Sequence, residues 1–268
     1  MNSNAWNKKR VLITVKAYPQ FSKKYIETVC TAGITEDGQW IRIYPLPFRN
    51  LPKDKQFSKY QWIEIELQRN ENDNREQSYR PKLSSITIVS PVLSTKNSWS
   101  ARNDVVLKTV APSLEYLKEN YPKTSLGIIR PKQILGFVAE KSPKNEMEEY
   151  QQLVMNFGDD GAVEITSPLR PIPYKFSYMF LCDDVNCKKP HKLSIIDWEL
   201  GSLIYNLQKS GRADEEIKKM VENKYFEFMC SPTKDTHFIV GNKYPYPDTF
   251  MVLGVYYPDA VRQLSLFQ

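Results

Sequence analysis

Alternation of apolar and polar side chains constrains the N-terminal part of this chain more than any other feature. In the stretch WIRIY, Ile41 and Ile43 fall on one side of an extended strand, and Trp40, Arg42 and Tyr44 fall on the other. Residues 62–67 repeat the pattern, with aliphatic side chains opposing a tryptophan and two glutamates. An Asp-Gly tight-turn signal precedes WIRIY. We therefore expect a small β-barrel or a strongly twisted β-sheet over residues 1–95.

The rest of the 268-residue chain mixes helical and extended patterns, so the predicted class is α+β. Residues 96–170 are interpreted as a mixed α/β connecting region, with a helix expected over 146–157 and a proline-rich linker after it. Residues 171–257 predict an α+β domain containing a Cys/His turn, and residues 258–268 form a tail. The polar stretch 70–79 is expected to be an exposed loop. We find no internal repeat in the sequence.

Positive charge is concentrated near the N-terminus. Residues 1–62 hold eleven Lys/Arg and four Asp/Glu, an excess of seven, whereas the whole chain carries only +6. A local basic field attracts polyanions, and an aromatic-Arg-aromatic face suits base stacking with phosphate contact. We therefore predict binding to DNA, with RNA as the alternative. The candidate residues are Lys8, Lys9, Arg10, Lys23, Lys24, Trp40, Arg42 and Tyr44. In the competing interpretation, a second layer covers this face and the aromatic side chains are core.

A cysteine–histidine cluster lies in the stretch CDDVNCKKPH. Cys182, Cys187 and His191 have the spacing C-x4-C-x3-H, and thiolate and imidazole are preferred zinc ligands. We expect a structural zinc site with Cys230 as the fourth ligand, and His237 as the second choice. The alternatives are free cysteines in a turn, or an iron–sulfur cluster made by all four cysteines of the chain.

The stretch DWEL holds the best candidate for a catalytic pair, Asp197 and Glu199. On a strand the two carboxylates would share a face, as a metal-dependent nuclease needs. On a helix, Asp197 would be the N-cap and Glu199 would lie in the first turn, which is the interpretation we favour. No phosphate-binding loop, dinucleotide fingerprint or zincin motif occurs in the sequence.

The C-terminal stretch QLSLF resembles the peptide by which many bacterial proteins bind the DNA polymerase sliding clamp. That pattern is Gln-Leu, then Ser or Asp, then Leu-Phe. The chain matches it at Gln263, Leu264, Ser265, Leu266 and Phe267. The resemblance covers these residues alone and implies recruitment to sites of DNA synthesis or repair, without implying a reaction. Alternatively, the alternating leucines belong to a last strand that packs on the core.

These features predict a cytoplasmic, nucleoid-associated protein that binds DNA in replication, repair or defence and is recruited through the sliding clamp. No apolar run is long enough for a membrane-spanning helix. Two alternatives stay open at this point. The first is a metal-dependent nuclease or other DNA-processing enzyme that uses Asp197 and Glu199. The second is a structural interaction protein whose tail is a core strand.

Overall fold

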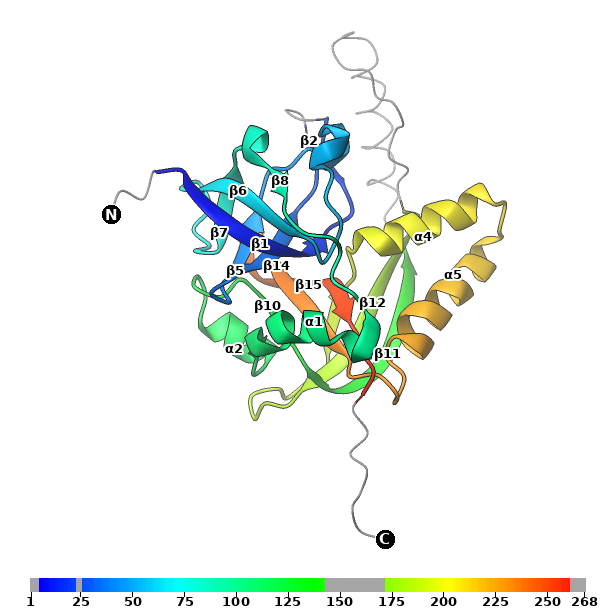
Figure 1. Ribbon diagram of the computed structural model, residues 1–268. Helices are drawn as coiled ribbons and strands as arrows, with labels where there is room; N and C mark the ends of the chain where they lie inside the picture. Colours follow the sequence, from blue (N-terminus) through cyan, green and yellow to red (C-terminus); the bar gives the residue numbers. More distant parts are fainter. Residues whose placement is uncertain (1–4, 23–25, 143–171, 261–268) are drawn as a thin grey trace.

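The computed structural model describes residues 5–22, 26–142 and 172–260, and these fold into two β-barrels that pack against each other (Figure 1). The predicted α+β class is confirmed. The expected helix over 146–157, most of the proline-rich linker and the tail motif lie outside the described residues. Within the described ranges, no helix is long and apolar enough to cross a bilayer.

The first barrel is drawn in blue and cyan in Figure 1. Its strands are β1 (Asn7–Lys16), β4 (Thr31–Thr35), β5 (Trp40–Ile43), β6 (Trp62–Arg69) and β7 (Ser78–Pro81), with β8 (Thr87–Ile88) added at the edge. Hydrogen-bonded neighbours run β1-β4-β5-β7-β6, and β6 pairs back with β1, which closes a ring of five strands. The pair β5–β7 is parallel and the other four are antiparallel. The barrel predicted from the alternating pattern is therefore confirmed.

Strand order identifies the type of barrel. When the five strands are numbered along the chain, their order is 1-2-3-5-4-1, with the third and fifth parallel. This is the topology of the OB-fold, a five-stranded Greek-key barrel. The loop between the first two strands carries a small hairpin of β2 (Gln20–Ser22) and β3 (Ile26–Thr28). Short 3₁₀ turns η1 (Phe48–Asn50) and η2 (Lys53–Lys55) lie between the third and fourth strands, and η3 (Leu83–Ser85) precedes β8.

The second barrel repeats this topology. Its strands are β10 (Leu126–Ile129), β11 (Pro131–Lys141), β12 (Tyr174–Cys182), β13 (His191–Ser194), β14 (His237–Lys243) and β15 (Tyr246–Tyr256). β10 and β11 are separated only by Arg130, and they pair with β14 and β12 respectively. β13 pairs with β12, and the next residue, Ile195, bridges in parallel to Val252 of β15. With β10 and β11 counted as one strand, the order is again 1-2-3-5-4-1.

This structural repeat was invisible in the sequence, and it changes the expected domain boundaries. β10 and β11 lie within the stretch 96–170 that we interpreted as a connecting region, but they are the first strand of the second barrel. Their pattern is interrupted by Arg130-Pro131, which hid their continuity. A short β9 (Val110–Ala111) pairs with β10. The helices are α1 (Lys96–Val106), η4 (Leu107–Thr109), α2 (Leu114–Glu119), α4 (Trp198–Lys209) and α5 (Asp214–Glu222), which continues as a π-helix over Asn223–Phe228.

Three apolar clusters hold the two barrels together. Ile41 and Ile43 of β5 fill the first barrel, as their alternation predicted, and the aromatic side chains of β12 lie in the core of the second. The third cluster lies between the barrels and includes Trp40 together with Ile128 and Leu253. Of the two interpretations of the polar face of β5, the structure therefore supports the covered one, because the second barrel leaves Trp40 7% and Arg42 3% exposed, although Tyr44 stays 42% exposed.

Candidate functional site

A pocket of about 370 Å³ lies where one face of the first barrel meets the second barrel. The first barrel contributes the β1–β4 loop, the end of β5 and the β6–β7 loop. The second barrel contributes Ile196 and residues of the β14–β15 hairpin. This volume falls in the range of roughly 300–1,000 Å³ that is usual for small-molecule sites. Two arginines, a lysine and one aspartate supply the charged groups of the lining, so the pocket is net positive.

Arg42 is the most deeply buried cation of the pocket. Its Nη1 donates to Oγ of Ser125 and its Nη2 donates to the Ser125 carbonyl, both at 3.1 Å. Burial is the main cause that lowers the pKa of Arg42, and the neighbouring Cys30 opposes that shift. Within the described part of the chain, no carboxylate forms an ion pair with Arg42. A buried guanidinium without such a partner can still donate to an anionic or carbonyl oxygen of a ligand.

Arg75 belongs to the stretch that we expected to be an exposed loop, but it is buried. Its Nε and Nη2 donate to the two oxygens of Asp73, at 2.8 and 2.6 Å, and its Nη1 donates to the carbonyl of Asn242 at 2.9 Å. Burial alone would raise the pKa of Asp73, but hydrogen bonds from Arg75 and Ser78 hold it below its usual value. Arg75 thus links this loop to β14 of the second barrel, while Glu71, Asn72, Asn74 and Glu76 of the same loop are exposed. Its sequence gave no apolar signal from which burial could be expected.

Two tyrosines lie at the mouth of the pocket. Tyr44 follows β5 and is 42% exposed, and Tyr244 lies in the β14–β15 hairpin and is 51% exposed. The guanidinium carbon of Arg75 lies 5.5 Å from the centre of the Tyr244 ring. A third tyrosine, Tyr18, lines the interior, and burial raises its pKa to about 12. Of the three, sequence reasoning had selected only Tyr44.

The basic side chains of β1 are less available for contacts with nucleic acid than the sequence indicates. Lys8 is paired with Glu64, and Arg10 donates to Glu36 at 2.8 Å. Lys9 lies 5.9 Å from the centre of the Tyr79 ring. Glu64 lies outside residues 1–62 and therefore offsets part of their excess charge, whereas Glu36 is already counted in that excess. Lys23 and Lys24 lie outside the described residues.

Asp197 is the N-cap of α4, as we favoured, and its side chain accepts from the backbone N–H of Glu199. The Nζ of Lys59 lies 3.3 Å from both oxygens of Asp197 and 3.4 Å from Oε2 of Glu199. An ammonium at this position neutralises the carboxylates that a divalent cation would need. In this structure the two carboxylates thus belong to the start of α4 and to an ion-pair group with Lys59.

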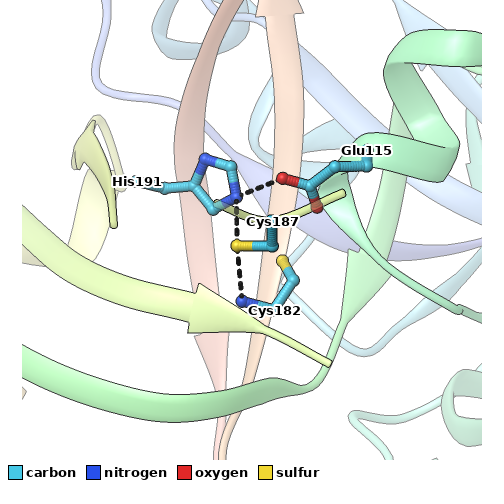
Figure 2. A group of neighbouring side chains, drawn as sticks. All are labelled: Glu115, Cys182, Cys187 and His191. Carbon is cyan, nitrogen blue, oxygen red and sulfur yellow. Dashed lines mark hydrogen bonds and ion pairs between the residues drawn. The ribbon is translucent and has the colours of Figure 1, made fainter. Parts of the chain in front are cut away.

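The structure brings Cys182, Cys187 and His191 together, and Glu115 of α2 completes the group (Figure 2). The expected fourth ligand, Cys230, is not part of it, because its thiol is directed to the carbonyl of Tyr225 at 3.4 Å. His237, the second choice, also lies apart, with its Nδ1 2.9 Å from the carbonyl of Asp235.

A cluster made by all four cysteines is excluded as well, because Cys30 lines the pocket of the first barrel. Sequence reasoning missed Glu115 because it lies far from the other three residues in the chain and carries no motif.

Two family models match this chain. The model described as Domain of unknown function (DUF8758) covers residues 7–108, and the one described as Domain of unknown function (DUF8757) covers residues 108–268. Their border lies between the last strand of the first barrel and the first strand of the second. No curated protein matches the chain significantly.

Two solved structures align with nearly the whole chain. A murine DNA binding protein bound with double-stranded DNA aligns over 96% of this chain and 97% of its own, at 11% identity and a TM-score of 0.33. The p204 HINb domain aligns over 97% of this chain and 100% of its own, at 10% identity and a TM-score of 0.33. At these TM-scores neither alignment establishes a common fold.

Proposed function

We propose that this chain, which belongs to the family described as Domain of unknown function (DUF8757), binds nucleic acid through the pocket that its first barrel forms with the second. The position of the pocket carries the proposal. In OB-folds, oligonucleotides and oligosaccharides bind over the second and third strands, between the loop that joins strands one and two and the loop that joins strands four and five. Here those loops are β1–β4 and β6–β7, and both line the pocket.

The chemistry of the lining favours a nucleotide over an oligosaccharide. Arg42 and Arg75 present N–H donors beside a net positive cavity, which suits phosphate and base-edge acceptors. Tyr44 and Tyr244 present exposed rings at the mouth, where a base can stack. A duplex is too wide to enter a cavity of about 370 Å³, so the preferred ligand is a single strand or an extruded nucleotide. DNA is the partner we propose, with RNA as the alternative.

We further propose that the protein acts as an accessory factor in replication, repair or defence and is recruited by a bacterial sliding clamp. The support is the QLSLF sequence at 263–267. The last described strand ends at Tyr256, and the backbone of Ala260 still bonds to the carbonyl of Thr233 at 2.9 Å. The motif thus begins three residues beyond the last described position.

The test of nucleic-acid binding compares two tyrosines of one hairpin. Tyr244 lines the pocket, whereas Tyr246 is 59% exposed and does not. Labelled single-stranded DNA, RNA and duplex are titrated by fluorescence anisotropy at low and moderate salt. Tyr244→Ala should weaken single-strand binding by the loss of one stacked base, about 1–3 kcal/mol, and Tyr44→Ala should act likewise.

Tyr246→Ala should leave the affinity unchanged and serves as the control. Equal affinities for wild type, Tyr44→Ala and Tyr244→Ala would overturn the proposal.

A further inference from the structure

Four side chains, three from the second barrel and one from α2, converge on one point (Figure 2). Glu115 comes from α2, Cys182 ends β12, Cys187 lies in the following turn, and His191 begins β13. One ligand atom from each lies within 4.8 Å of every other. All four side chains are buried or half-buried, so this is not a chance meeting of solvated surface groups.

A single ring nitrogen faces both the thiol and the carboxylate. Nε2 of His191 lies 3.4 Å from Sγ of Cys187 and 2.7 Å from Oε1 of Glu115. A catalytic Cys-His-carboxylate arrangement uses one ring nitrogen for the nucleophile and the other for the carboxylate. One nitrogen, with one proton or one lone pair, cannot serve both partners well. A cation held between the three atoms resolves this conflict.

Backbone N–H groups point at the sulfur atoms of both cysteines. The N–H of Leu114 donates to Sγ of Cys182 at 3.4 Å, and the N–H of Cys182 donates to Sγ of Cys187 at 3.3 Å. Outer hydrogen bonds of this kind orient the ligands of metal sites. The other carboxylate oxygen of Glu115, Oε2, is buried without a well-formed hydrogen bond among the described residues. A bound cation would give this buried oxygen a partner.

We propose that Glu115, Cys182, Cys187 and His191 bind one zinc ion in a closed structural site. Zinc takes thiolate sulfur at about 2.3 Å and imidazole nitrogen at about 2.0 Å, so a tetrahedral site separates these atoms by roughly 3.5 Å. The observed separation of 3.4 Å between Cys187 and His191 is close to that value, and the 2.7 Å between His191 and Glu115 would lengthen by about 0.5 Å on binding zinc. Two sulfurs, one nitrogen and one oxygen suit zinc, whereas iron–sulfur clusters are generally held by cysteine thiolates.

The site has a structural task in this fold. α2 follows the first barrel, and the turn from Cys182 to His191 joins the second and third strands of the second barrel. Zinc would join these two segments, which are also linked by hydrogen bonds from Ser113 to Asp184, from Leu114 to Cys182 and from Asn186 to Glu119. Four protein ligands leave no open position for a substrate. The inference does not depend on the proposed nucleic-acid binding.

The test measures metal on the full chain. Purified protein should contain about one zinc per chain, because a closed structural site uses all four ligands. Cobalt(II) replacing zinc should give the visible absorption of a tetrahedral thiolate site. Cys187→Ala should abolish both signals, and Glu115→Ala should weaken zinc binding at least about tenfold in competition with a chelator.

Cys230→Ala is the matched control, since Cys230 is a half-buried cysteine outside the group, and it should keep the full zinc content. If Glu115→Ala does not fold, the cobalt spectrum of the wild type shows whether a tetrahedral thiolate site exists. A wild-type protein that binds neither metal overturns the site. Loss of zinc in Cys230→Ala, or unchanged affinity in folded Glu115→Ala, overturns the ligand set.

Discussion

Lys59 and Asp197 form an ion pair buried between the two barrels, with Nζ 3.3 Å from each carboxylate oxygen. Lys59 precedes β6 of the first barrel, and Asp197 caps α4 of the second. Both side chains are almost fully buried. The pair therefore joins the two barrels, and its Asp197 also caps α4. We expect its loss to lower the stability of the whole fold.

Removing one member of this pair should destabilise the protein strongly. Asp197→Ala leaves a buried ammonium without its partner and removes an N-cap, so we expect a loss of about 3–5 kcal/mol in the free energy of unfolding. Urea denaturation measures it. Glu199→Ala is the control, because Glu199 is exposed and should cost less than about 1 kcal/mol. A small effect of Asp197→Ala would show that the pair does not hold the barrels together.

Gly201 of α4 should not tolerate a side chain. A Cβ at this position would lie 1.9 Å from the ring of Tyr18, which lines the pocket. Gly201→Ala must displace that ring, so we expect a destabilisation of about 1–3 kcal/mol together with altered ligand binding.

The control for this substitution is Gly136→Ala on β11, where a Cβ would meet nothing within 4 Å. Its stability should change by less than about 0.5 kcal/mol. Equal thermal stabilities for the two variants would contradict the close approach of Tyr18 to α4.

Lys16 should make stability depend on alkaline pH. Its pKa is lowered to about 8, mainly because the ammonium is buried and then because of the neighbouring Lys59, while Glu199 and Asp197 oppose the shift. Between that value and the ordinary value of 10.5, the unfolded chain binds more protons at this residue than the folded one. The contribution of Lys16 to stability therefore rises with pH across this window.

Lys16→Met removes the titration, and the difference between variant and wild type isolates it. The difference in the free energy of unfolding between wild type and variant should shift in favour of the wild type by up to about 3 kcal/mol between pH 7 and pH 10.5. Denaturant titrations at both pH values measure it. A difference that does not change with pH would contradict the lowered pKa.

The basic strand should matter less for nucleic-acid binding than the pocket. Replacing Lys8 and Arg10 with alanine removes charges that are already paired with Glu64 and Glu36. We expect a weaker salt dependence and an affinity loss smaller than that of Tyr244→Ala. A larger loss would move the binding surface from the pocket to β1.

The C-terminal motif should bind a clamp without stabilising the fold. Alanine at Leu266 and Phe267 should abolish most of the binding, which we expect to be roughly micromolar for one short peptide, because a few anchor residues dominate such contacts. Calorimetry with a purified bacterial clamp measures the affinity. If the double variant instead loses thermal stability, the motif is a core segment.

Some features of this protein were determined locally and could be predicted from the sequence. The alternation in WIRIY correctly assigned Ile41 and Ile43 to the interior, because successive side chains of a strand point to opposite faces. Asp197 was predicted as an N-cap from its position before an apolar periodic stretch, and the structure confirms it. The grouping of Cys182, Cys187 and His191 followed from their short spacing, which a single turn can close.

What the sequence could not decide depends on contacts between distant segments. The two OB-folds are defined by pairings such as β1 with β6 and β5 with β7, and no local pattern encodes strand order. The second barrel covers the polar face of β5, which turns Arg42 from an expected surface contact into a buried donor. In the same way, Glu115 meets the cysteines only because α2 packs on the turn after β12. Burial and convergence are properties of the assembled chain, because only tertiary packing brings these segments together and removes water from between them.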